Sequence, residues 1–258
     1  MYTPCRIYCI IMITMYVLEN EMLKIEGLVK TYGDVRAVDG LTLNVEPGEL
    51  YAFIGHNGAG KTTTIKCAAG ILTFDGGTIE VAGHDIRREP VQAKKLMAYI
   101  PDDPNIYGYM TGMQYLGFLS DIFEIDEKTR KERIEKYAEL LSLKAALMMP
   151  VNEYSHGMKQ KLAVIGAFIH EPKLIIMDEP FVGLDPVAAF TLKGLMREHC
   201  DSGGAIFFST HVLDVAEKLC DRVAIIKEGR LVKTGSMEEV RGDKSLESVF
   251  LELEDKNA

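Results

Sequence analysis

A glycine loop at residues 55–62 carries the most specific chemistry in this chain. It reads Gly-His-Asn-Gly-Ala-Gly-Lys-Thr, matches the pattern G-x-x-x-x-G-K-[ST], and lies between the apolar run 50–54 and the helix-compatible run 63–69. Glycines let backbone N–H groups close around phosphates, and a helix N-terminus favours negative charge. The loop therefore predicts a nucleoside triphosphate site rather than a simple strand-ending turn, with Lys61 reaching the β- and γ-phosphates and Thr62 reaching Mg²⁺. The residues expected to bind are Gly55, His56, Asn57, Gly58, Ala59, Gly60, Lys61, Thr62 and Thr63.

Two acidic residues follow a second apolar run. Residues 174–177 read Leu-Ile-Ile-Met, which is typical of a buried parallel strand, and Asp178 and Glu179 come next. Open α/β sheets bind ligands at the carboxyl ends of their strands. We expect Asp178 to hold Mg²⁺ and Glu179 to take a proton from the attacking water.

The remaining elements must position these residues. Alternation over 23–28 predicts an antiparallel strand, with turns at 39–40, 47–48 and 75–77, and 223–232 reads as a hairpin before a helical tail that opens at 236. Residues 106–169 have a helical pattern, in which Asp126 is the expected N-cap and one face is apolar. The expected fold is α/β, with a nucleotide core, a flanking antiparallel sheet and a separate helical lobe. The apolar face is formed by Ile134, Tyr137, Ala138 and Leu141.

Further motifs occur in a fixed order around the Asp-Glu strand. The segment 154–162 reads Tyr-Ser-His-Gly-Met-Lys-Gln-Lys-Leu and precedes it, and Gly-Leu-Asp-Pro at 183–186 and Ser-Thr-His at 209–211 follow it. Together with Thr-Tyr-Gly at 31–33, these resemble the signature, D-loop, switch histidine and adenine-stacking loop of ATP-binding cassette (ABC) ATPases. The resemblance covers Met22 to about Leu253, nearly the whole chain.

The resemblance implies a P-loop NTPase (RecA-like) core, a flanking antiparallel β-subdomain and an inserted α-helical subdomain at about 106–169. It implies that Tyr32 stacks on adenine and that His211 senses the γ-phosphate, acting with Lys61 and Glu179 in catalysis. Family members pair head to tail, so Ser155 and Gly157 would meet the ATP held by a second ATPase subunit, identical or different. ATP and Mg²⁺ are the implied cofactors.

Three positions depart from the family pattern. Asp102 stands where a glutamine is expected; its carboxylate can meet Mg²⁺ or its waters but cannot donate a hydrogen bond. His156 replaces a usual glycine and Met158 a usual glutamine. Histidine tolerates left-handed backbone better than most residues, so we expect the turn to survive at His156, and slower hydrolysis stays open.

Composition excludes some classes of function. A net charge of −9 argues against a general nucleic-acid surface, which needs clustered basic residues. The five cysteines are scattered and lack a C-x₂-C pair, which indicates reduced thiols. The uncharged run 7–18 is too short to span a bilayer. We interpret residues 1–21 as an extension outside the fold, ahead of a 22–258 ATPase domain, with a signal peptide or a membrane-touching tail as alternatives.

The sequence thus predicts an ATP-hydrolysing ABC transporter subunit on the cytoplasmic face of the cell membrane, working with a separate membrane subunit. The stretch Asp102–Thr111 and the adjacent lobe are expected to contact that subunit. Pro-Asp-Asp-Pro at 101–104 and the tail 245–253 resemble exporters. The alternatives are a soluble non-transport ABC ATPase, which usually carries two cassettes or a basic arm, and a weakly hydrolysing regulatory cassette, which would lose Glu179 or His211. The cargo is expected to be chosen by the membrane subunit.

Overall fold

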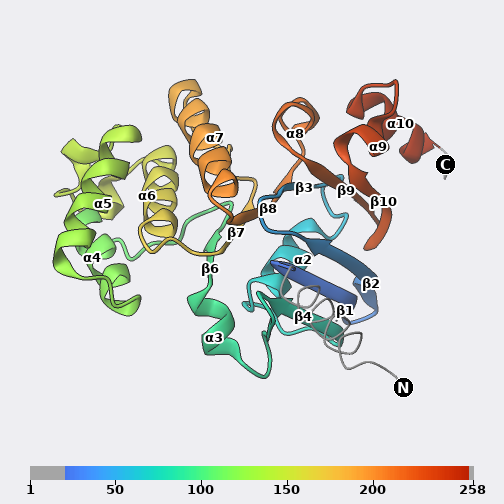
Figure 1. Cartoon of the computed structure of the whole chain (residues 1–258), viewed down its shortest axis with the longest axis horizontal. Coiled ribbons are helices and arrows are strands. Elements are labelled where there is room, and N and C mark those ends of the chain that lie inside the picture. The colour runs from blue at the N-terminus through green and yellow to red at the C-terminus, as the bar shows by residue number, and fades with distance from the viewer. Residues whose placement is uncertain (1–20, 256–258) are drawn as a thin grey trace, which may run out of the picture.

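A computed structural model describes residues 21–255, so the expected extension at 1–21 lies almost wholly outside the described residues. A six-stranded sheet in the order β10-β9-β3-β8-β7-β6 forms its centre (Figure 1). All its neighbouring strands run parallel except the antiparallel pair β9–β10, which confirms the hairpin predicted at 223–232. The strands are β3 (Leu50–Ile54), β6 (Met97–Ile100), β7 (Leu174–Asp178), β8 (Ala205–Thr210), β9 (Arg222–Lys227) and β10 (Arg230–Ser236).

The second sheet has four antiparallel strands in the order β2-β1-β4-β5. This confirms the flanking antiparallel sheet, but the turn predicted at Asp39–Gly40 is wrong. Both residues lie within β2, where the register to β1 shifts, because a glycine at positive φ produces a bulge without ending the strand. The strands are β1 (Leu23–Tyr32), β2 (Val35–Val45), β4 (Gly76–Val81) and β5 (His84–Asp85).

Helices cover the central sheet and form the lobe beside it. In Figure 1, α4 (Gly112–Ile122), α5 (Glu127–Leu140) and α6 (His156–Phe168) gather at one end of the molecule, and short 3-10 turns at Lys144–Ala146 and Val151–Glu153 lie between α5 and α6 in sequence. Asp126 caps α5 by accepting from the Thr129 N–H at 3.0 Å, as predicted, and the predicted apolar face is buried. The other helices are α2 (Lys61–Ala68), α3 (Pro90–Lys95), α7 (Pro186–Asp201), α8 (Leu213–Leu219), α9 (Met237–Arg241) and α10 (Leu246–Asp255).

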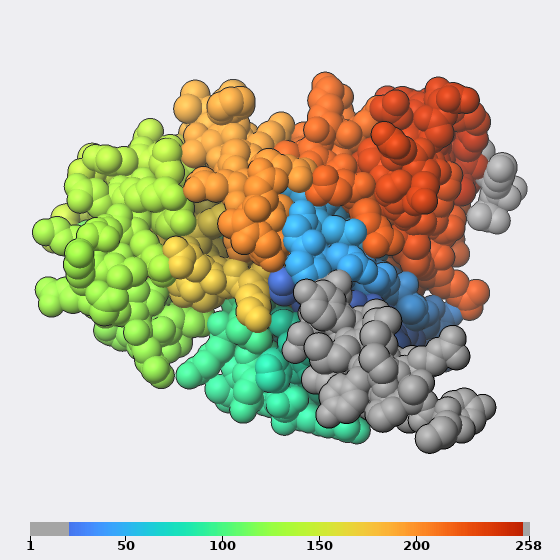
Figure 2. Space-filling model, in the orientation of Figure 1, coloured from blue at the N-terminus to red at the C-terminus, as the bar shows by residue number. Residues whose placement is uncertain are grey.

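Two hydrophobic cores lie on opposite faces of the central sheet. Alternate side chains of β3 enter each core: Ala52 packs with the lobe and α7, and Phe53 packs with α2 and the antiparallel sheet. All residues of β3, β7 and β8 are buried, so these strands hold their carboxyl ends rigidly. Figure 2 places α4 and α5 at one end of the molecule and the C-terminal helices at the other. Within residues 21–255, no helix combines the length and apolar character needed to cross a bilayer.

Candidate functional site

The glycine loop joins β3 to α2, as the sequence predicts. Gly60 is the N-cap of α2 and has φ +106°, which side-chain-bearing residues rarely adopt. A Cβ at this position would also lie 2.5 Å from the carbonyl oxygen of Ala37 on β2. The loop is therefore fixed by close contact with the antiparallel sheet as well as by its own strand and helix.

Lys61 lies across this loop with its side chain directed inward. The residue is 6% exposed, and its Nζ donates to the carbonyls of Gly55 at 2.6 Å and His56 at 3.1 Å. Burial lowers the pKa of Lys61, while the charges of Glu179 and Asp178 act in the opposite direction. The Lys61 ammonium therefore interacts electrostatically with the carboxylates of Glu179 and Asp178.

Asp178 ends β7 and is 1% exposed. Ser209 lies opposite it on β8; its hydroxyl donates to Asp178 Oδ1 at 2.5 Å and accepts from the backbone N–H of Glu179 at 3.0 Å. One serine thus fixes both the carboxylate and the residue after it. A carboxylate has a second acceptor oxygen, so Asp178 retains the chemistry needed to meet a divalent cation or its waters.

Glu179 adopts a backbone conformation that favours glycine. Its φ is +46°, a strained value for a residue with a side chain, and strain of this kind persists where the surroundings fix the residue. Its Oε2 lies 3.0 Å from His211 Nδ1 and accepts from the His211 N–H at 3.3 Å. The carboxylate is therefore oriented by the residue that follows β8.

Tyr32 lies at the end of β1, where the chain turns into β2. Its side chain is 48% exposed, and Lys30 Nζ lies 5.1 Å from the ring centroid. The same hairpin contacts the glycine loop through Ala37. The structure therefore presents an open aromatic ring on the hairpin that touches the phosphate loop.

Ser155 and Gly157 lie on the helical lobe. Ser155 is exposed and caps α6, where its hydroxyl accepts from the Met158 N–H at 3.2 Å. The turn is retained at His156, as expected, but it needs no left-handed backbone: His156 is the first residue of α6 and is not among the described residues with positive φ. The substitution for glycine is tolerated because a helical start needs no glycine.

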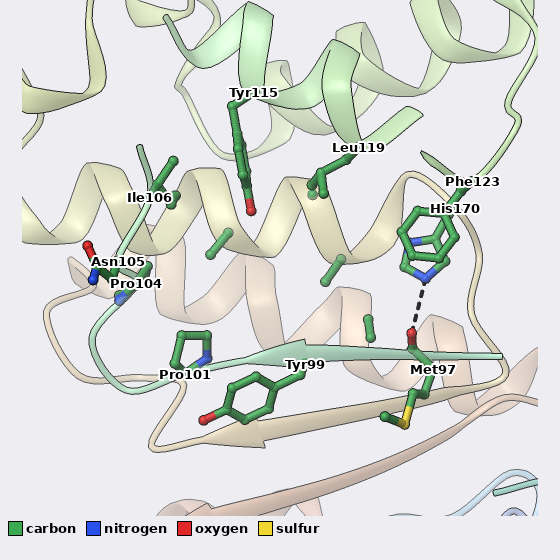
Figure 3. Close-up of a pocket in the computed structure, with 14 residues that line it drawn as sticks. Met97, Tyr99, Pro101, Pro104, Asn105, Ile106, Tyr115, Leu119, Phe123 and His170 are labelled. Atoms are coloured by element: carbon green, nitrogen blue, oxygen red, sulfur yellow. Dashed lines mark hydrogen bonds between the residues drawn. The ribbon is translucent and has the colours of Figure 1, made fainter. Parts of the chain in front are cut away.

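Asp102 follows β6 and is exposed. Partial desolvation of its carboxyl raises the pKa of Asp102, and the negative charges of Asp178 and Glu179 raise it further. The Asp102 carboxyl therefore interacts electrostatically with both core carboxylates. Behind it lies a cavity of about 250 Å³ that is lined by residues of β6, α4 and α6. Figure 3 shows Tyr115 and Leu119 pointing into this cavity from α4, with the Pro101 to Ile106 stretch along its side.

The structure gathers Lys61, Thr62, Asp178, Glu179 and His211 at the carboxyl ends of three neighbouring strands, β3, β8 and β7. Ser155 and Gly157 lie apart, on α6. Sequence reasoning missed the role of Ser209, although its place before His211 at a strand end was a usable signal. The predicted helical tail is confirmed by α9 and α10, but sequence reasoning missed the contact of α10 with the glycine loop, where the Phe250 ring lies 4.8 Å from the His56 ring and Glu254 lies 3.3 Å from His56 Nε2.

Comparisons with known proteins agree on one family. The ABC transporter model matches residues 38–182. The chain is 36% identical over 235 residues to YxlF of Bacillus subtilis (strain 168), an uncharacterized ABC transporter ATP-binding protein, covering 91% of this chain and 78% of that one. It is 33% identical to the daunorubicin/doxorubicin resistance ATP-binding protein DrrA of Streptomyces peucetius, over 92% of this chain and 72% of that one. Two further relatives are longer, and the chain spans 63% and 59% of their lengths.

A solved structure of the ATP binding subunit of an ABC transporter has the same fold. Its TM-score is 0.87 at 33% identity, over 90% of this chain and 99% of that one. This likeness confirms the predicted α/β architecture, with a P-loop core and an antiparallel flanking sheet.

Proposed function

The chain belongs to the ABC transporter family as an ATP-binding subunit, and we propose that it hydrolyses ATP to drive export through a separate membrane subunit. The observation that carries hydrolysis is the group formed by Glu179, His211 and Ser209 opposite a buried Lys61. A carboxylate aimed from a strained backbone position and bonded to a histidine is suited to a general base, and it would be an unusual arrangement for a binding module alone.

Binding of the triphosphate is assigned to residues 55–63 and to Tyr32. Lys61 would exchange its carbonyl partners for phosphate oxygens, and the N–H groups at the start of α2 would meet the same charge. Thr62, Asp178 and Asp102 would hold Mg²⁺, since a hydroxyl and two carboxylates suit a hard cation. When bound, the ion would neutralise charge on the phosphates.

Proton transfer is assigned to Glu179. Its carboxylate would accept a proton from the water that attacks the γ-phosphate, and His211 would keep that carboxylate in place and contact the same phosphate. Ser209 would hold the Glu179 backbone so that the base does not turn away. The expected product is ADP with inorganic phosphate.

The second half of each site would come from another copy or a related subunit. Ser155 is exposed and Gly157 half-buried at the start of α6 on the lobe, whereas the phosphate loop lies on the core. Head-to-tail pairing would bring the Ser155 hydroxyl and the N-terminus of α6, a helix of 13 residues, to the γ-phosphate of the opposite site. Closure and reopening of that pair would move the membrane subunit.

The membrane subunit is proposed to dock beside the cavity of Figure 3. An aromatic–methionine patch is exposed there, and patches of this kind suit contact with another protein. The resistance named for DrrA supports export. Because the ATP is cellular, the proposed location of the chain is the cytoplasmic face of the membrane. The patch consists of Tyr107, Tyr109, Met113, Met148 and Met149, with Tyr109 80% exposed.

A mixing experiment tests the shared site. Lys61→Ala removes the phosphate contact in one chain and Ser155→Arg blocks the signature in another, so each homodimer has two damaged sites. A mixed dimer contains one site with both residues intact, and part of the wild-type ATPase activity should return. Mixing Lys61→Ala with the Lys61→Ala, Ser155→Arg double variant is the matched control, since it restores no site. Heterodimers without recovered activity would contradict the shared site.

Docking is tested by cross-linking in membranes. A Tyr109→Cys chain treated with a thiol cross-linker should form a product with a membrane-spanning polypeptide. Val91→Cys on α3 is the control, because Val91 is also exposed, at 61%, but lies outside the patch. Equal products from both positions would argue against docking at the patch.

A further inference from the structure

The first turns of α6 are packed directly against the segment that leads into α7. Gln160 is fully buried and its Nε2 lies 3.5 Å from the Pro180 carbonyl, and Lys161 Nζ lies 2.7 Å from Asp185 Oδ2. A Cβ at Gly157 would lie 2.5 Å from the Gly183 carbonyl oxygen. The signature turn and the D-loop of one chain are thus in contact through backbone as well as side chains.

His156 lies at the centre of this contact. Gly183 has φ +77°, and a Cβ there would lie 2.3 Å from His156 Cδ2 and 3.0 Å from Nε2, so the imidazole covers the D-loop glycine. The opposite ring nitrogen, Nδ1, lies 3.6 Å from Asp103 Oδ1. A single side chain therefore touches the D-loop on one side and the segment 101–106 on the other.

The segment 101–106 connects this histidine to both the core and the cavity. Pro101, Pro104, Asn105 and Ile106 line the cavity beside the lobe. Asp102, next to Asp103, is within electrostatic reach of Asp178 and Glu179, and the His156 charge acts on the same carboxyl in the opposite sense. Movement of this segment would therefore displace His156 and, through the imidazole ring, Gly183.

We propose that His156 is a positioning residue that couples the segment 101–106 to the D-loop. The imidazole packs on Gly183 and keeps the D-loop against α6. Because the same imidazole pairs with Asp103, its packing on Gly183 depends on the position of the segment 101–106. A glycine at position 156 would lack both contacts. The inference rests on the proposed function, because the D-loop then lies beside the ATP site and the segment 101–106 beside the membrane subunit.

Two substitutions separate the two contacts of His156. His156→Phe retains a ring to cover Gly183 but cannot pair with Asp103, whereas His156→Asn retains a nitrogen donor near the position of Nδ1 but lacks the ring carbons. The rate of amide hydrogen exchange at residues 180–185 in the nucleotide-free chain measures how firmly the D-loop is kept against α6. His156→Asn should speed exchange there about two- to fivefold, in keeping with the loss of one exposed contact, with little change in Tm. His156→Phe, which keeps the ring but loses the pairing with Asp103, should speed exchange less than His156→Asn does.

Coupling is tested by adding Asp103→Asn. In the wild-type background this substitution should speed exchange of residues 180–185, and in the His156→Phe background it should have no further effect. The kcat of His156→Asn should fall with the KM for ATP unchanged, which general loss of structure would not produce. His84→Phe with Glu89→Gln is the matched control, because His84 Nδ1 on β5 pairs at 3.2 Å with Glu89, the N-cap of α3, away from these loops.

The outcomes distinguish this inference from the function on which it rests. Unchanged exchange of residues 180–185 in His156→Asn, or equal effects of Asp103→Asn in both backgrounds, would overturn the coupling even if the wild-type chain hydrolyses ATP. A wild-type chain that binds but never hydrolyses ATP would overturn the proposed function, while exchange in the nucleotide-free chain would still measure the contact.

Discussion

The proposed site has two halves that are built in different ways: a core half at the strand ends, with Lys61, Asp178 and Glu179, and a signature half at the start of α6, with Ser155 and His156. In the core, Lys61 is 6% exposed and Asp178 1% exposed, and both already have hydrogen-bond partners within the chain. On the lobe, Ser155 is exposed and the His156 side chain is 43% exposed. The core half is therefore held by contacts within the chain, whereas the signature half presents its groups outward.

The difference follows from the elements that carry each half. Three neighbouring parallel strands, β3, β8 and β7, end at one edge, and their backbone hydrogen bonds fix the residues that follow. The signature residues stand on the first turn of a single helix, which is held by contacts with two loops. Rigid positioning thus belongs to the proposed catalytic groups, and adjustable positioning to the groups proposed to contact a second subunit.

The largest expected effect is at the core base. Glu179→Gln should lower kcat about 10²- to 10⁴-fold, because it removes the proton acceptor, while retaining ATP binding, so an ATP-bound dimer should accumulate. Size-exclusion chromatography with ATP and a hydrolysis assay measure both. Glu171→Gln is the control, since Glu171 has a similar φ of +49° but pairs with Arg133 outside the site. Undiminished hydrolysis without a dimer would show that Glu179 is not the general base.

Ser209→Ala tests whether the hydrogen bonds of Ser209 hold the core half together. Leaving the buried Asp178 oxygen without its donor should lower the free energy of unfolding by about 1–3 kcal/mol and should also slow hydrolysis, since the Glu179 backbone loses its partner. Denaturant unfolding and an ATPase assay check this. Ser120→Ala is the matched control, because Ser120 is equally buried but donates only to a helix carbonyl, that of Leu116. Equal losses in both variants would argue against a special role for Ser209.

Tyr32→Ala tests whether the exposed Tyr32 ring contributes as much to ATP binding as the buried Ser209 contributes to folding stability. Loss of base stacking should weaken ATP binding by about 1–3 kcal/mol, with little change in the Tm of the nucleotide-free chain, because the ring is half exposed. Calorimetric titration and thermal melts measure the two quantities. Tyr32→Phe should bind ATP like the wild type. A large fall in Tm with unchanged affinity would instead identify a structural tyrosine.

The smallest effect is expected at Asp102, which stands between the two halves. Its pKa is raised by burial and by Asp178 and Glu179, so the folded state disfavours its charged form. The associated stability is fully present below the unfolded value of about 3.9 and is lost as the pH rises through the folded pKa. Asp102→Asn should therefore raise the Tm of the magnesium-free chain by about 1–2 °C at pH 7 and by nothing below pH ~4. Asp102→Glu, which keeps the charge, should show no such gain, and a pH-independent difference would contradict the argument.

Much of the fold and of the core half could be predicted from local pattern. The buried strands ending at Ile54 and Asp178, the hairpin after β8 and the N-cap at Asp126 all depend on residues close together in sequence. The bulge at Gly40 could not be predicted in this way. A glycine with positive φ suits a turn or a bulge equally well, and only pairing with β1 decides between them.

The sequence by itself determined the family of this protein, through a phosphate-loop motif, an Asp-Glu pair, and motifs that resemble the switch histidine and the signature, in an order that identifies the family. Only the tertiary structure decided how these groups are held. Ser209 bridges Asp178 and Glu179, His156 covers Gly183 beside Asp103, and α10 reaches His56. Each of these contacts joins segments far apart in the chain, and their meeting depends on strand order and lobe packing, which periodicity and motif spacing do not encode.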